Sequence, residues 1–107
     1  MTVVPSVDDV TAMRLRALQL AYMDLKRWPD NPGLEGAFMT LLRDAAEAIV
    51  GLYGALFVQK AGHLLDRQHI LLRLSMLGLK DDLAIAVYAT IVERMVRDGF
   101  RILPGVA

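Results

Sequence analysis

Apolar residues recur every three or four positions along most of the chain, which is the spacing of one helix face. The first predicted helix spans residues 7–28 and ends at the turn formed by Pro29 to Gly33. Ser6 is its expected N-cap. The predicted apolar face of this helix comprises Leu15, Leu18, Ala21, Tyr22, Leu25 and Trp28.

The second predicted helix, residues 34–59, has a continuous apolar face and two glycines off that face. Gly51 and Gly54 lie three positions apart, and each glycine costs about 1 kcal/mol relative to alanine in a helix interior. We therefore expect another backbone to approach closely here, from the same fold or from a second subunit. The apolar face comprises Phe38, Leu41, Leu42, Ala45, Ile49, Leu52, Tyr53 and Leu56.

Two further helices are predicted in the second half of the chain. A break at Ala61-Gly62 precedes the third, residues 63–77, which is expected to end at the C-cap glycine Gly78. Asp81 is the expected N-cap of the fourth, residues 82–100. The third helix presents a broad apolar face: Leu64, Leu65, Leu71, Leu72, Leu74 and Met76. The fourth carries two apolar stripes, and the second of them is expected to contact a neighbouring subunit: Ile85, Val92 and Val96.

These patterns predict an all-α protein without strands, arranged as an antiparallel up-down four-helix bundle. The 107 residues fit one domain spanning residues 1–107, with short irregular tails at residues 1–5 and 104–107. Hydrophobic residues make up 55% of the chain, which excludes intrinsic disorder. That fraction is also more than one small core can hide, so we expect the protein to associate with itself as a homo-oligomer.

The charge balance and the cysteine content exclude several classes of function. Twelve basic residues balance twelve acidic residues, so no overall field draws the chain to nucleic acid or anionic lipid. The absence of cysteine excludes disulfide scaffolds and thiolate chemistry. No secretory signal is visible, and the longest apolar run, residues 48–58, is shorter than the roughly 20 residues that span a membrane. We therefore expect a cytoplasmic protein with no membrane partner.

Candidate catalytic groups are sparse. His63, Asp66 and His69 lie at i, i+3 and i+6 and would spread over about 120° of a helix, whereas metal ligands usually share one line. Neither Ser6 nor Ser75 lies in a nucleophile or phosphate-binding motif. We predict no enzymatic activity, no metal and no cofactor. A metal-dependent bundle enzyme that uses His63 and His69 is the alternative.

Three arginines near the C-terminus form a candidate anion-binding stripe. Arg94, Arg97 and Arg101 lie at i, i+3 and i+7, within about 60° on one line of the last predicted helix. Arg27 and Arg67 could extend this patch. Acidic neighbours flank the stripe, so a solvated or subunit-paired stripe is the open alternative to phosphate binding.

The order of several features matches a known family. They are the Trp28-Pro29 end of the first helix, the apolar pattern of residues 38–55, the Leu-rich segment 71–74, Tyr88, and the ending at residues 98–105. In this order they resemble the four-helix-bundle proteins related to those encoded in ribosomal RNA intervening sequences. The chain is most similar to the accessory variability determinant proteins of diversity-generating retroelements, with the resemblance covering residues 21–106.

The resemblance implies a non-catalytic accessory protein assembled into a homo-oligomeric ring, typically a pentamer. Its implied partners are the retroelement's reverse transcriptase and the template RNA or cDNA, where it supports mutagenic cDNA synthesis. Arg73 and Arg101 match basic positions of the family, and Arg94 and Arg97 join them through the helical-face argument. Family members are strongly basic whereas this chain is neutral, which favours polymerase contact over general nucleic-acid binding. The alternative is an orphan homo-oligomeric bundle of the intervening-sequence type with a structural or RNA-binding role.

Overall fold

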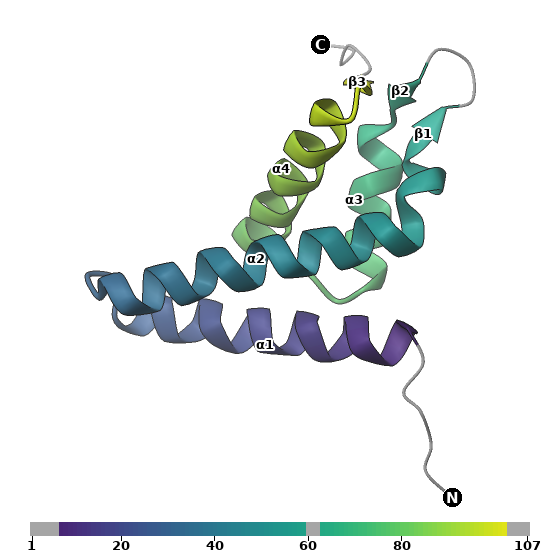
Figure 1. Cartoon of the computed structure of the whole chain (residues 1–107). Coiled ribbons are helices and arrows are strands. Elements are labelled where there is room, and N and C mark those ends of the chain that lie inside the picture. Colours follow the sequence, from purple (N-terminus) through teal and green to yellow (C-terminus); the bar gives the residue numbers. More distant parts are fainter. Residues whose placement is uncertain (1–6, 60–62, 103–107) are drawn as a thin grey trace, which may run out of the picture.

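The computed structural model describes residues 7–59 and 63–102, and its regular structure is almost entirely helical (Figure 1). The all-α class is therefore confirmed. The expected cap Ser6 and the expected break at Ala61-Gly62 lie outside the described residues. In chain order the elements are α1 (Val7–Arg27), α2 (Pro32–Tyr53), the 3-10 helix η1 (Gly54–Phe57), β1 (Val58–Gln59), β2 (Leu64–Leu65), α3 (Arg67–Met76), α4 (Asp81–Arg97) and β3 (Arg101–Ile102).

The α1–α2 hairpin forms where the Pro- and Gly-rich turn was expected. The Asn31 side chain caps α2 by accepting hydrogen bonds from the backbone N–H groups of Gly33 (2.9 Å) and Leu34 (3.3 Å). Pro32 lies in the first turn of α2, where its missing N–H leaves no bond unmade. Because Asn31 supplies the cap, α2 begins two residues before the predicted start.

The end of α2 differs from the prediction, which extended this helix to Gln59. The chain tightens into η1 at Gly54 and then becomes extended at Val58. β1 pairs antiparallel with β2, and β2 pairs parallel with β3, placing Leu64 opposite Arg101. The prediction of no strands is therefore wrong for this small sheet of two-residue strands, which are too short to show an alternating pattern.

The third helix begins at Arg67, later than predicted. The Asp66 carboxylate accepts the backbone N–H of His69 at 3.2 Å, so Asp66 is the N-cap of α3 and the preceding residues belong to β2. The predicted end is confirmed: Gly78 has φ +85°. Its N–H bonds the Ser75 carbonyl, and the N–H of Leu79 bonds the Leu74 carbonyl, which is a Schellman motif.

The fourth helix is shorter than predicted at its C-terminal end. Its N-cap is Lys80 and not Asp81, which instead lies in the first turn. At the other end Gly99 adopts φ +102°, and the Phe100 N–H bonds the Met95 carbonyl at 3.2 Å. This second Schellman motif ends α4 at Arg97 and turns the chain into β3.

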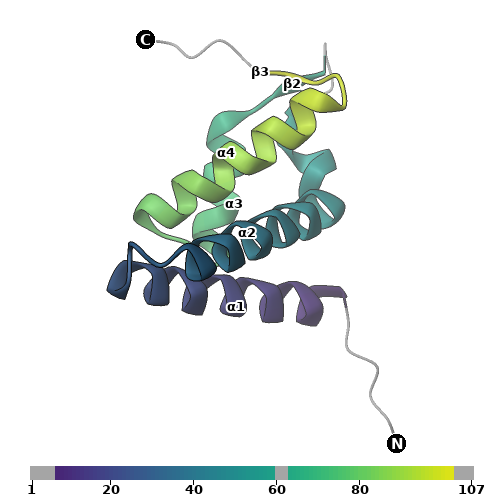
Figure 2. The same ribbon diagram turned by 60° about the vertical axis from the view of Figure 1, so that its left-hand side comes forward.

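Figures 1 and 2 show two helical hairpins that meet along α2. α1 runs alongside α2, whereas α3 and α4 rise away from it at a steep angle, with the small sheet at their far end. Four helices are thus present in the described part of the chain, but the second hairpin is inclined to the first and not aligned with it. No described helix is long and apolar enough to cross a membrane.

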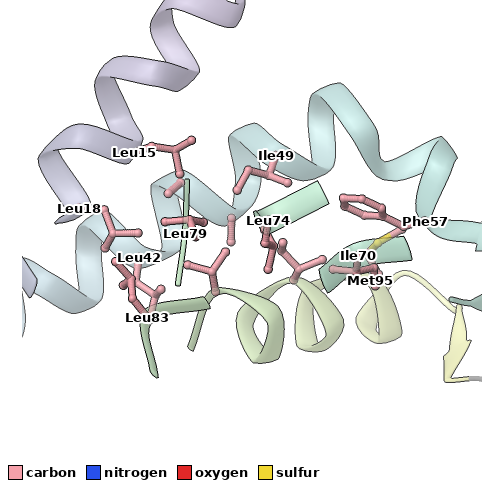
Figure 3. Close-up of a cluster of buried hydrophobic side chains, with 14 of the residues drawn as sticks. Leu15, Leu18, Leu42, Ile49, Phe57, Ile70, Leu74, Leu79, Leu83 and Met95 are labelled. Carbon is pink, nitrogen blue, oxygen red and sulfur yellow. The ribbon is translucent and has the colours of Figure 1, made fainter. Parts of the chain in front are cut away.

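One hydrophobic core holds the hairpins together, and it draws side chains from every helix and from η1 (Figure 3). Most residues of the predicted faces of α1 and α2 are buried in this core or packed against it. The largest side chains that it buries completely are Leu18, Ile49, Phe57, Leu65, Ile70, Leu74, Leu79, Val87 and Ile91.

Four predicted core positions are wrong. Trp28, Leu56, Leu72 and Met76 are exposed by 61%, 47%, 60% and 65%. Leu72 follows Ile70 by two residues, so at about 100° per residue it points to the opposite side of α3. Trp28 and Leu56 lie just beyond the C-terminal ends of α1 and α2, where the helical line of the buried face no longer applies.

Candidate functional site

The arginines Arg94 and Arg97 lie along a groove between α2 and α4. The groove has a volume of about 430 Å³, with Leu42 and Ala46 among its apolar lining residues. Arg43 and Glu47 contribute from α2. It therefore combines apolar surface with charges of both signs.

Arg94 is held by two carboxylates. Its Nε donates to Glu47 Oε1 at 2.6 Å, and its Nη1 lies 2.5 Å from Asp98 Oδ2. The hydrogen bond to Asp98, followed by that to Glu47, raises the pKa of the Arg94 guanidinium above its ordinary value. Arg94 therefore joins α4 to α2, and two carboxylates of the same chain largely neutralise its charge.

Arg97 is more accessible than Arg94. Its Nη2 lies 2.9 Å from Glu93 Oε1, one turn earlier on α4, and both side chains are about 70% exposed. An exposed pair at this spacing contributes little to stability, so the pair can open for another anion. Arg97 is consequently the arginine of this groove that a phosphate or carboxylate could reach at least cost.

Arg101 does not continue the helical line of Arg94 and Arg97, which is a correction to the predicted stripe. It belongs to β3, after the turn at Gly99, and its backbone N–H donates to the His63 carbonyl at 3.0 Å. Its side chain is exposed. The sequence signal that could have placed the helix end before Arg101 is Gly99 itself, because a helix commonly ends just before a glycine.

Arg73 belongs to a different part of the molecule. It lies on α3, half-buried, with its guanidinium 4.7 Å from the ring centroid of Tyr53 at the end of α2. Its Nε is buried and has no hydrogen-bond partner within the described residues. Glu47 and Tyr53 are six residues apart on α2 and therefore point about 120° apart. The structure thus does not bring Arg73 into the groove of Arg94.

The two arginines considered as extensions are also separate from the groove. Arg67 lies at the start of α3, 5.9 Å from the ring centroid of Tyr88 on α4. Arg27 ends α1 and lines a shallow surface at the α1–α2 turn together with Trp28. Neither of them lines the groove that contains Arg94 and Arg97.

The two glycines at which a close backbone approach was expected have opposite environments. Gly51 is exposed, and a methyl group built on it would meet no atom within 4 Å. Gly54 is buried, and the same methyl would lie 3.4 Å from Val50 Cγ1 and 3.8 Å from Met95 Cε. Gly54 therefore packs within its own fold, which is the first of the two alternatives expected from the sequence, and it is not exposed for a subunit contact, whereas Gly51 is exposed.

The second apolar stripe of α4 is at the surface. Ile85 and Val96 are 61% and 44% exposed, and Val92 is half-buried against the edge of the core. Ala89 lies between them on the same line and is exposed. This stripe, which we call the α4 outer stripe (Ile85, Ala89, Val92, Val96), lies opposite the buried face of α4.

A second exposed apolar line, on α1, was missed from the sequence. Met13, Leu20 and Met23 are 67%, 56% and 64% exposed. Their positions repeat at the seven- and three-residue spacing of a helix face, so the pattern was present in the sequence. The apolar residues of the buried face, Leu15 and Leu18, lie on the opposite side of α1 and form a separate stripe at helical spacing.

The two histidines have separate packing positions. His63 is exposed, with φ +53°, and its ring lies 6.0 Å from that of Phe100. His69 is half-buried, 6.4 Å from the Phe57 ring. Within residues 7–59 and 63–102 no three His, Asp, Glu or Cys side chains gather in a way that could hold a metal ion.

Comparison of the chain with protein-family models, with curated proteins and with solved structures finds no match.

Proposed function

We propose that this protein is a non-catalytic accessory scaffold that works by docking proteins through exposed apolar helix faces. The observation that carries this proposal is the α4 outer stripe, on which Ile85 is 61% exposed and Val96 44% exposed. Contiguous apolar surface of this kind marks interaction sites in proteins. The charges also favour apolar docking over phosphate binding, because Arg94 and Arg97 already have carboxylate partners.

The family resemblance supplies the proposed partners. On it we propose that the chain assembles in the cytoplasm as a ring of four-helix bundles, a pentamer in the family, and binds the reverse transcriptase of a diversity-generating retroelement. Template RNA or cDNA is then held mainly by the polymerase. Arg97 and Arg101 are the exposed arginines that could add phosphate contacts.

Capture of the purified reverse transcriptase by the tagged protein tests this function. Ile85→Glu combined with Val96→Glu should abolish capture, because two charges would have to be buried without partners. Leu72→Glu combined with Met76→Glu is the matched control, since both are exposed apolar residues on α3. Circular dichroism and the helical content it reports should be unchanged in both variants.

A second variant separates apolar docking from phosphate contact. Replacing Arg94, Arg97 and Arg101 together with Glu should leave polymerase capture within about threefold of the parent protein. Retained capture by the Ile85/Val96 variant, or its loss in the arginine variant alone, would contradict the proposed docking through α4.

A further inference from the structure

The outer side of α1 carries an apolar line with no cover in the described structure. In both Figure 1 and Figure 2, α1 forms one edge of the molecule, with α2 on one side and no other labelled element on the opposite side. Met13, Leu20 and Met23 on this line are each more than half exposed. Methionine-rich surfaces adapt readily to a facing surface, so this line is suited to contact another helix.

The spacing along this side of α1 is that of a coiled-coil seam, and it reads the same in both directions. Successive exposed residues are separated by four, three, four, three and four positions, which is the a/d pattern of a heptad. The members of the seam are Asp9, Met13, Arg16, Leu20, Met23 and Arg27. Its midpoint is the level of Leu18, which itself points into the core.

Because the spacing of the seam is symmetric about its midpoint, each seam residue of one copy lies opposite a seam residue of a second, antiparallel copy of α1. Met13 of one copy faces Met23 of the other, and Arg16 faces Leu20. Ala17, beside the midpoint, is small enough to let the two backbones approach closely. A parallel pair would instead place Arg16 opposite Arg16, which repels.

The charges also favour the antiparallel pair. Arg16 and Asp24 are eight residues apart, or about 12 Å along one helix, too far for an ion pair within a chain or in a parallel pair. In the antiparallel pair their axial separation falls to about 6 Å. Helical side chains lean toward the N-terminus of their own helix, so these two lean toward each other. Neither has an ion-pair partner within the described residues.

We propose that α1 is a homodimerisation helix, and that two copies of this chain pair antiparallel through the seam Met13–Leu20–Met23 about a two-fold axis at the level of Leu18. A two-fold contact closes after two copies. It is therefore a different contact from the α4 outer stripe and goes beyond the proposed function. Three large apolar residues per copy make this a concentration-dependent dimer.

Cysteine cross-linking tests the register, and the chain has no native cysteine. Met13→Cys and Met23→Cys proteins are prepared separately, mixed and oxidised. The mixture should give a disulfide-linked dimer, while each protein alone should not, because in the antiparallel pair equivalent residues lie about 15 Å apart along the axis. Cross-linking of each protein alone, or no cross-linking in the mixture, would overturn the proposal.

A charge exchange gives an independent readout by sedimentation equilibrium. Arg16→Asp alone and Asp24→Arg alone should each raise the dimer dissociation constant at least tenfold, and the double variant should return it to within about threefold of the parent. A double variant whose dimer dissociation constant is as high as those of the single variants would contradict the ion pair and therefore the antiparallel register. Ile85→Glu/Val96→Glu should leave this dimer intact, so loss of polymerase capture and loss of α1 pairing are distinguishable.

Discussion

The guanidinium of Arg94 on α4 donates a 2.6 Å hydrogen bond to the carboxylate of Glu47 on α2, two residues 47 positions apart in the chain. This bond lies in the groove between the two helices and makes the first arginine of the predicted stripe an internal link between α2 and α4. Asp98, just after α4, pairs with Nη1 of the same guanidinium. Phosphate binding to Arg94 would have to displace both carboxylates.

Removing both carboxylates should therefore expose a phosphate-binding group. We expect Glu47→Gln/Asp98→Asn to change the melting temperature little, since exposed ion pairs contribute little stability. Its affinity for single-stranded RNA should rise, with a salt-dependence slope steeper by about 0.7 for one added phosphate contact. Fluorescence anisotropy across a salt series measures both quantities.

The control for this prediction has the same change in net charge away from the groove. Glu35→Gln/Asp44→Asn also removes two negative charges, from exposed positions on α2 that do not line the groove. Equal gains in RNA affinity for the two double variants would mean that net charge alone matters, and would contradict a specific role for Arg94.

Substitution of Arg73 gives a second test, which distinguishes a role in packing from a role in ligand binding. Its Nε is buried without a hydrogen-bond partner in the described part of the chain, and its guanidinium lies over the Tyr53 ring. Arg73→Met keeps the long stem and removes the unsatisfied donor, so we expect the free energy of unfolding to stay equal or rise. Arg73→Ala also removes the stem and should lower it by about 1–3 kcal/mol.

Urea unfolding followed by circular dichroism measures both Arg73 variants. If Arg73 instead serves the polymerase or RNA, as the family resemblance implies, Arg73→Met would lose partner binding while keeping its stability. A marked loss of stability in Arg73→Met would show that the guanidinium itself stabilises the fold, contrary to the packing interpretation.

Local signals account for what the sequence predicted well. The Pro29-to-Gly33 turn and the cap at Asn31 are set by residues close in the chain, and so is the glycine end of α3 at Gly78. The buried faces of α1 and α2 follow from periodicity alone, because apolar residues recur at helical spacing along each of them. These features need no knowledge of how the helices meet.

Non-local pairing accounts for what the sequence did not predict. β2 pairs with β3 across 37 positions, from Leu64 to Arg101, and two-residue strands leave no pattern to detect. The bond between Glu47 and Arg94 depends on how α4 sits on α2, which the sequence of neither helix specifies. Gly99 was different, because its signal was local and was outweighed by the continuing apolar pattern up to Phe100.

The position of the core predicts that substitution of two similar apolar residues will change the free energy of unfolding by very different amounts. Ile49 is fully buried, whereas Leu72 is 60% exposed. Ile49→Ala should lower the free energy of unfolding by about 2–5 kcal/mol, because a cavity remains in a packed core. Leu72→Ala should change it by less than about 0.5 kcal/mol. Chemical denaturation of the two variants at one protein concentration measures the difference, and similar losses would contradict the placement of α3.

Two glycines predict opposite effects of the same substitution. Gly99 has φ +102°, a conformation that strains any residue with a Cβ, so Gly99→Ala should destabilise the protein by about 1 kcal/mol or more. Gly51 lies inside α2 with open space around it, so Gly51→Ala should stabilise the folded subunit by about 0.5–1 kcal/mol.

The same Gly51 variant tests whether this position lies in a subunit contact. If another backbone approaches Gly51 closely, the added methyl group would weaken self-association while still stabilising the isolated subunit, and the two effects separate with protein concentration. Thermal melting at low and high concentration, with sedimentation on the same samples, measures both. A Gly51→Ala protein that is more stable and associates as strongly as the parent would remove Gly51 from the interface and leave Ile85, Val92 and Val96 as the residues assigned to it.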